Sequence, residues 1–556
     1  MVGKDWEDGF FMGIAVGSTA ETSSDDTTAY VPPSDWINID NCDAGNINLL
    51  VADTSIATYA FVCTTSSGQY HVDWGDGTSS NVDGGSTAQH TYAIGTGQVC
   101  SRGYTTFKVV ISPVIGNLLS FKVTNHSLAN SPQTYGILAC KCGAIYIASL
   151  SNAFYGSTNP VVKCTSLEWF KTSGTLVSCL NTTSMLGYCS SLQDVDLSGF
   201  TSVTNATDMF AYCYSILDID ISPMVSLVNI YQTFSNCSAL QTLNAKGLAN
   251  ITTIGSTFLN CQSLKNVDMS GMTSLQSTTR MFENCRSLKS VSMDGLSSVS
   301  TSDYMFSGCN SLLEADLSSM TSLYNASSMF YYCYALKKVN LSGLGKLFYA
   351  NAMFGSCFSL PDADLSYMAS LGRTPGMFLN CYNLQSVNLS GLNKITDSQQ
   401  MFDHCFAIQY ADISDMILVN TASSMFAYCY SLQSISSNGF STSATSLVAD
   451  KMFSFCEQLA TIDLSSAKLT YFEANGSSGF VTKLTSFIFH SSSTFAYSSI
   501  TQTLNLSYTS LSNTAIDAIF TALPNVVSKT VNITGSTGAA TCTRSIATAK
   551  GWTVTG

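Results

Sequence analysis

The chain has 556 residues, of which only 11% are charged, and its formal net charge is −13. This acidic balance argues against nucleic-acid binding, which needs a basic face. The sequence contains no run of 18 apolar residues, so we expect no membrane-spanning helix. A short apolar run at residues 10–16 follows an acidic segment instead of a basic one, and we therefore expect no secretory signal peptide.

Residues 1–39 are expected to form an extended segment. They include the acidic, serine-rich stretch at 21–26 and the pair Pro32-Pro33, which are typical of chain without a packed core. We expect this segment to dock onto a larger particle.

Residues 40–115 are predicted to form a small β domain, with strands at 59–63 and 106–111. Between them, Gly75-Asp76-Gly77 predicts a tight turn after a strand that ends at Trp74. The motif Trp-Gly-Asp-Gly-Thr at 74–78, followed by His-Thr-Tyr at 90–92, resembles the signature of PKD-type β-sandwich domains. The resemblance implies an extracellular spacer or an interaction domain.

Two features of this domain stay open at the level of sequence. The spacing of Cys63 and Cys100 does not decide whether they pair. The second feature is a possible calcium site. The spacing of Asp73, Asp76 and Asp83 is not that of an ordered calcium-binding loop, and we expect Asp76 to hold the turn. Whether calcium binds there stays open.

A repeat with a period of 24 residues follows. It is marked by cysteines at equal spacing, with Cys456 added after a three-residue insertion: Cys189, Cys213, Cys237, Cys261, Cys285, Cys309, Cys333, Cys357, Cys381, Cys405 and Cys429. A fixed period of this length is typical of a solenoid, in which each turn buries its apolar face against its neighbours.

Each repeat predicts one short strand and an aromatic core. Leu264, Val267 and Met269 illustrate the L-x-x-V-x-L spacing of a leucine-rich-repeat strand, whose alternate side chains point inward. Three residues before each cysteine from Cys213 to Cys456 stands a phenylalanine, which we expect to stack inside the array. The cysteines then lie inside the turns as small apolar residues and free thiols. Metal binding is disfavoured, because neither paired C-x-x-C motifs nor nearby histidines accompany them.

The same strand spacing extends beyond the cysteine repeats, at residues 118–123, 142–147, 167–172 and 484–489. We therefore predict a mainly β fold, with a leucine-rich-repeat solenoid of about 16 turns over residues 116–510. Residues 511–556 are predicted to form a small α/β cap. It contains a helix at 514–520 that Ser512 or Asn513 caps, a strand at 530–534, and a short helix before Gly551.

The repeat motif Phe-x-x-Cys-x-Ser-Leu-x-x-Val-Asp-Leu-Ser resembles the BspA-like leucine-rich repeats of bacterial surface proteins and of some bacteriophage proteins. The resemblance covers roughly residues 118–510. It implies an adhesin or recognition protein without enzymatic activity.

Catalytic motifs are not evident, and we expect neither a catalytic residue nor a cofactor nor a metal site. His404 precedes Cys405, but other turns place unrelated residues there, and the cysteine belongs to the buried series. Acid pairs of a polysaccharide-acting enzyme stay an alternative, because ladder aspartates could place two carboxylates within about 5–9 Å of each other.

Two series of side chains are candidates for binding. One is aromatic and directly follows the cysteine in five consecutive turns: Tyr334, Phe358, Tyr382, Phe406 and Tyr430. The other stands seven residues after the cysteine, on the outer face of the strand, where aspartates alternate with asparagine or serine: Asp268, Asp316, Asp364 and Asp412. Skipping a turn separates like charges by about 10 Å, close to one Debye length. The alternatives are self-stacking for the rings and a hydrogen-bonded ladder for the aspartates.

These observations favour a recognition protein displayed on a surface. We expect a bacteriophage virion appendage of the tail-fibre or receptor-binding type, which contacts a host glycan or protein through the array and other virion proteins through its N-terminal region. A bacterial cell-surface adhesin is the alternative. A homo-oligomer is compatible with the sequence, although no coiled-coil heptad sets its symmetry.

Overall fold

The computed structural model describes residues 30–53, 58–93, 96–124, 136–155, 164–268, 271–473, 481–493, 495, 503–527 and 529–556. The chain divides into two units, Met1–Val31 and Pro32–Gly556, and the strands and helices all belong to the second. Most of the predicted extended segment, residues 1–29, lies outside the described residues.

The N-terminal strands form an antiparallel sheet that continues into the repeats. Its strands are β1 (Ile47–Asp53), β2 (Thr58–Asp73), β3 (Ser79–Asp83), β4 (Thr87–Thr91), β5 (Gln98–Val99) and β6 (Thr105–Val123). The nine-stranded sheet runs β3-β2-β6-β1-β7-β8-β9, with β4 beside β2 and β5 beside β6. The predicted boundary at residue 115 lies within β6.

The motif residues of this region interlock. His90 Nε2 lies 2.7 Å from Asp76 Oδ2, and the Thr78 amide and hydroxyl donate to Asp76 Oδ1 at 3.0 and 2.6 Å. The Tyr92 hydroxyl donates to the Trp74 carbonyl at 2.7 Å, and the His90 ring stacks on Trp74. Burial alone would raise the pKa of Asp76, but the hydrogen bonds from Thr78 and His90 outweigh it and lower the pKa. Asp76 therefore holds the turn.

Two predicted repeat strands at the start of the array are wrong. Residues 118–123 belong to β6, which pairs antiparallel with β2, so that Phe121 lies opposite Cys63. Residues 142–147 follow the strand instead of forming it, because the strand there is β7 (Ile137–Cys142). β7 is buried almost throughout between β1 and β8, and residues 137–140 form the unbroken apolar run of a strand buried on both faces, which an alternating template does not detect.

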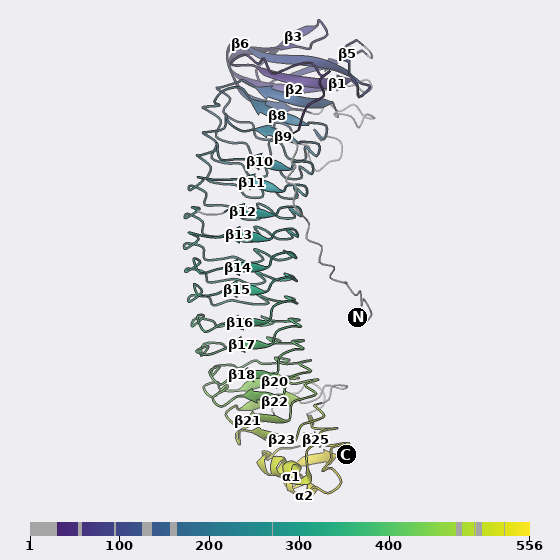
Figure 1. The fold of residues 1–556 in the computed structure, drawn as a ribbon, viewed down its shortest axis with the longest axis vertical. Coiled ribbons are helices and arrows are strands. Elements are labelled where there is room, and N and C mark those ends of the chain that lie inside the picture. The colour runs from purple at the N-terminus through teal and green to yellow at the C-terminus, as the bar shows by residue number, and fades with distance from the viewer. Residues whose placement is uncertain are drawn as a thin grey trace, which may run out of the picture. The chain divides into compact units, whose positions relative to one another are not determined.

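From β8 to β19 the repeat strands follow one another in chain order, as Figure 1 shows, whereas farther on β20 pairs with β22 and β21 with β23. They are β8 (Trp169–Thr172), β9 (Asp194–Asp196), β10 (Asp218–Asp220), β11 (Thr242–Asn244), β12 (Asn266–Asp268), β13 (Ser290–Ser292), β14 (Glu314–Asp316), β15 (Lys338–Asn340), β16 (Asp362–Asp364), β17 (Ser386–Asn388), β18 (Tyr410–Asp412), β19 (Ser434–Ser436), β20 (Leu447–Asp450), β21 (Thr461–Leu464), β22 (Leu469–Glu473) and β23 (Ser486–Phe489). The mainly β solenoid with its 24-residue period is confirmed, with about 15 turns.

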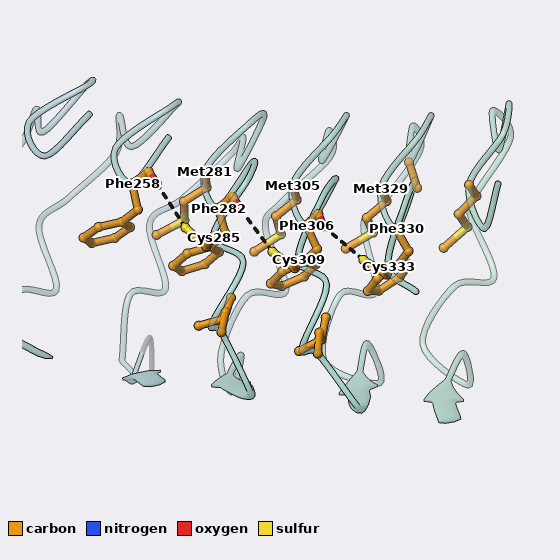
Figure 2. Packing of buried hydrophobic residues seen from close by; sticks show 14 of the residues in the cluster. Phe258, Met281, Phe282, Cys285, Met305, Phe306, Cys309, Met329, Phe330 and Cys333 are labelled. Atoms are coloured by element: carbon orange, nitrogen blue, oxygen red, sulfur yellow. Dashed lines mark hydrogen bonds between the residues drawn. The ribbon is translucent and has the colours of Figure 1, made fainter. Parts of the chain in front are cut away.

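A stack of phenylalanines fills the inside of the turns. Phe306 and Phe330 have ring centroids 5.4 Å apart and Phe330 and Phe354 5.5 Å apart, with nearly parallel planes, and all three are fully buried. From Cys237 to Cys456, each repeat cysteine thiol donates to the carbonyl of a phenylalanine in the preceding turn, as Cys333 does to Phe306 at 3.1 Å (Figure 2). All twenty cysteines are unpaired, Cys63 and Cys100 included.

The C-terminal end carries a three-stranded parallel sheet with two helices. The sheet contains β24 (Thr503–Asn505), β25 (Lys529–Asn532) and β26 (Trp552–Thr555), and the helices are α1 (Asn513–Ala522) and α2 (Arg544–Thr548). The Ser512 side chain caps α1 by accepting from the Ala515 amide at 3.2 Å. Buried Ile516, Ile519 and Phe520 pack the helix against the core.

Candidate functional site

The five aromatic residues that directly follow a repeat cysteine form one continuous stack, which we call the aromatic stack: Tyr334, Phe358, Tyr382, Phe406 and Tyr430. Successive ring centroids are 4.7, 4.7, 4.7 and 5.3 Å apart, and the first three pairs of planes are tilted by 14° or less. The 24-residue period places each ring one turn above the previous one, so the sequence positions alone align them.

The aromatic stack lies at the protein surface. Tyr334, Tyr382 and Tyr430 are 38%, 37% and 39% exposed, whereas the phenylalanines of the core stack are fully buried. Both faces of the Tyr382 ring are covered by its neighbours, so its accessible part is the outer edge with the hydroxyl. Burial of the Tyr334 and Tyr430 side chains raises the pKa of each phenol, which therefore stays protonated at neutral pH.

A second aromatic column, which the sequence analysis missed, stands beside the aromatic stack. It occupies the position directly before the cysteine, where Tyr332 contacts Tyr334 edge-on and Tyr428 contacts Tyr430 in the same way. Along this column, the Tyr428 ring stacks on His404 of the preceding turn and on Phe455 of the following turn. The ring centroids are 4.2 and 4.4 Å apart, respectively. The 24-residue spacing of these side chains could have predicted the column, although only some turns have an aromatic residue at this position.

The strand-face aspartates end the strands. The carboxylates of Asp316, Asp364 and Asp412 each accept from the backbone amide two residues later, at 2.8, 3.1 and 3.0 Å. Asparagines on the following turns donate to two of them: Asn340 to Asp316 at 3.0 Å, and Asn388 to Asp364 at 2.9 Å. Hydrogen bonds from Ser318, chiefly, lower the pKa of Asp316. The structure thus gives the aspartates a hydrogen-bonding role, and all four, Asp268 included, are exposed.

Comparison with known protein families matches this repeat. The model of the BspA type leucine-rich repeat region matches residues 152–256, 231–361 and 351–476, together more than half of the chain. The chain belongs to the BspA-type leucine-rich repeat family. No curated protein matches the sequence.

Three of the solved structures that match the chain are the following. The functional domain of InlJ from Listeria monocytogenes is 15% identical, with 66% of this chain and 75% of that chain covered and a TM-score of 0.24. A leucine-rich repeat protein from Eubacterium ventriosum is 13% identical, with 58% and 87% covered and a TM-score of 0.26. The Toll–Spatzle complex from Drosophila is 13% identical, with 71% and 54% covered and a TM-score of 0.24. These likenesses carry no argument about function.

The BspA-type array gives His404 and Cys405 structural roles. His404 Nδ1 lies 2.7 Å from the buried carboxylate of Asp403, and the Cys405 thiol, which is fully buried, donates to the Phe378 carbonyl at 3.2 Å. Burial raises the pKa of the Cys405 thiol well above its usual value, so the thiolate that a nucleophile needs is disfavoured. Among the described residues, no three or more His, Cys, Asp or Glu side chains are grouped to hold a metal ion. No described helix is long and apolar enough to cross a membrane.

The buried thiols predict selective alkylation. In the native BspA-type array, iodoacetamide is expected to modify Cys42 and Cys542, which are partly exposed, well before the other eighteen cysteines. Burial raises the pKa of the array thiols, to about 12 for Cys237 and Cys381, and only the thiolate reacts. Intact-mass spectrometry counts the adducts, and guanidinium-denatured protein, in which all twenty react, is the control. Rapid addition of more than two adducts to native protein would contradict the buried arrangement.

Proposed function

We propose that this protein is a non-enzymatic recognition protein displayed on a surface, which binds its partner through the aromatic stack. The observation that carries the proposal is the row of five rings at the surface, of which the three tyrosines are exposed and the two phenylalanines half-buried. The core does not need it, because earlier turns have Ser238, Gln262, Arg286 and Asn310 at the same position. Contiguous exposed aromatic surface is typical of binding sites, and aromatic side chains are enriched at protein interfaces.

The strand face is the second part of the proposed binding surface. A hollow opens there between β17 and β18, lined by Asn388, Ser390, Asp412, Ser414 and Asp415. Its carboxylates, amide and hydroxyls suit a ligand with many hydrogen-bonding groups. Asp268, Asp316 and Asp364 stand at the corresponding place on other turns.

The proposed place of display is a bacteriophage virion. The likeness of residues 74–92 to the PKD signature supports a spacer or interaction domain next to the particle, with residues 1–39 docking onto other virion proteins. The partner is then a glycan or protein on the host surface. The second candidate is a bacterial cell-surface adhesin, which the BspA-type repeat supports equally. Mass spectrometry of purified virions distinguishes the two, because only a virion protein copurifies with the particles.

Binding through the aromatic stack predicts the phenotype of a double substitution. The variant Tyr382→Ala with Phe406→Ala is expected to bind target cells at least about 30-fold more weakly, since aromatic residues central to an interface cost about 2 kcal/mol or more when truncated. Titration of fluorescently labelled full-length protein onto a panel of bacterial cells measures the change.

The matched control is Tyr324→Ala. Tyr324 is 47% exposed and stacks on Phe348 at 5.6 Å, but it lies outside the aromatic stack. We expect wild-type binding for this variant and native circular dichroism for both. If the folded double variant binds as well as the wild type, the proposed function is wrong.

A further inference from the structure

The strand side of the array is built from units of two turns. The strands pair as β14 with β15, β16 with β17 and β18 with β19, and within residues 271–473 this ladder is interrupted between neighbouring pairs. Elsewhere on the turns, single parallel bridges such as Thr301 to Asn325 and Asn325 to Tyr349 join each turn to the next. The hydrogen bonds from Asn340 to Asp316 and from Asn388 to Asp364 lie inside these pairs. A buried position eleven residues after the cysteine follows the same 48-residue period, with alternating methionine and leucine: Met224, Leu248, Met272, Leu296, Met320, Leu344, Met368, Leu392 and Met416.

The aromatic stack has the same two-turn period. Its order is Tyr-Phe-Tyr-Phe-Tyr, so phenol hydroxyls recur at every second ring, on Tyr334, Tyr382 and Tyr430. Ring steps of 4.7 Å place Tyr334 and Tyr382 two steps apart, close to the ~10 Å expected for two stacked strands. Within the fully described stretch 271–473, none of these three hydroxyls hydrogen-bonds to the protein. A ligand along the stack therefore meets the same polar group once per two turns.

We propose that the aromatic stack binds a linear, uncharged polysaccharide whose repeating unit is two sugars, lying along the direction in which the turns stack. This inference rests on the proposed function and names the class of its ligand. In an extended β-1,4-linked chain, each sugar is rotated by about half a turn relative to the one before, so chemically equivalent groups recur every second sugar. That repeat is comparable in length with the spacing of the three phenol hydroxyls.

The accessible groups suit sugars better than a peptide. Both faces of the central rings are covered, so the surface offers ring edges and hydroxyls, which hydrogen-bond to sugar hydroxyls but leave little apolar area for a helix to bury. The pleat of an extended peptide repeats at about 6.6–6.8 Å, which does not match the spacing of the phenol hydroxyls. The ligand is uncharged because the aromatic stack contains no charged side chain, while the net charge of −13 disfavours a polyanion.

A second copy of the chain would also match the two-turn period. However, a stable protein interface needs about 800 Å² from each partner. Five ring edges that are at most 39% exposed supply much less. The polysaccharide is therefore the occupant that the geometry favours.

The test is a binding series with oligosaccharides of two to six sugars. The probes are β-1,4-linked oligomers of glucose and of N-acetylglucosamine, titrated into the full-length protein by calorimetry, with α-1,4-linked glucose oligomers as the geometric control. We expect affinity to rise about three- to tenfold at four and again at six sugars, with little gain at odd lengths, since each even step adds one hydrogen bond to a phenol.

Two conservative variants test the register. Tyr382→Phe keeps the ring and removes one hydroxyl in register, so we expect its affinity for the six-sugar probe to fall about three- to tenfold. Phe358→Tyr adds a hydroxyl out of register, and we expect no gain. Both variants retain the stacked rings, so a folding defect does not confuse the result.

Several outcomes would overturn the inference. They are equal gains at odd and even lengths, equal binding of α-1,4 oligomers, wild-type affinity of Tyr382→Phe, and no binding of any β-1,4 probe. Dimerisation that Tyr382→Phe abolishes, or capture of a protein partner by the stack, would overturn it too. If the double variant Tyr382→Ala with Phe406→Ala still loses cell binding in these cases, the proposed function stands and only the ligand class is wrong.

Discussion

Replacing Phe330 with alanine is expected to lower the free energy of unfolding by about 3–5 kcal/mol. Phe330 is fully buried between Phe306 and Phe354, with ring centroids 5.4 and 5.5 Å away. Its removal leaves a cavity that neighbouring turns cannot close, because their own spacing is fixed by backbone hydrogen bonds such as Phe330 N to Met353 O at 2.8 Å. Urea unfolding followed by circular dichroism measures the loss.

The matched control for this prediction is Phe358→Ala, on the next turn. Phe358 stacks between Tyr334 and Tyr382 at 4.7 Å, but it is only partly buried. We expect a loss of about 1 kcal/mol, the value of an aromatic pair near the surface. Equal losses for the two variants would show that the buried phenylalanine stack is no more important to stability than the exposed one.

Replacing Gly75 with alanine is expected to cost about 3–5 kcal/mol and to unfold the N-terminal sheet first. Gly75 has a φ of 79°, in the left-handed region, and an added Cβ would lie 2.3 Å from the Lys108 carbonyl oxygen on β6. Backbone atoms cannot yield as a flexible side chain can, so the substitution adds a clash to the conformational strain. Hydrogen exchange of β2 and β6, together with calorimetry, measures the effect.

Gly77 provides the control within the same turn. Its φ of 89° is equally left-handed, but an added Cβ meets no atom within 4 Å. Gly77→Ala is therefore expected to cost only the strain, about 1–2 kcal/mol. If Gly75→Ala were no worse than Gly77→Ala, the close approach of this turn to β6 would be unimportant.

The repeated part of the fold could be predicted because its contacts are local. Side chains that recur every 24 residues must meet their own equivalents on the next turn, so the spacing of Phe330 and Cys333 predicts their stacking partners. Exposure of the aromatic stack followed from the polar residues at the same position in earlier turns. The sequence left open whether these rings stack on one another, and the structure shows that they do.

The start of the array could not be predicted in this way. Leu118 and Phe121 have the spacing of a repeat strand, but their partners on β2 lie more than fifty residues earlier and run antiparallel. Periodicity contains no information about such a partner. The alternation of aspartate with asparagine was visible and was explained by charge repulsion, whereas the structure adds a direct cause, the hydrogen bond from Asn340 to Asp316.

The pairing of turns has a consequence for how the gene can change length. Deleting the 24 residues of one turn, for instance 333–356, would remove Asn340 and bring Asp316 next to Asp364, two carboxylates about 5 Å apart without the amide that separates them. Deleting 48 residues, for instance 333–380, would instead bring Asn388 next to Asp316 and keep an amide beside the carboxylate. In this part of the array the strand-face contacts are therefore preserved by a change of two turns and lost by a change of one.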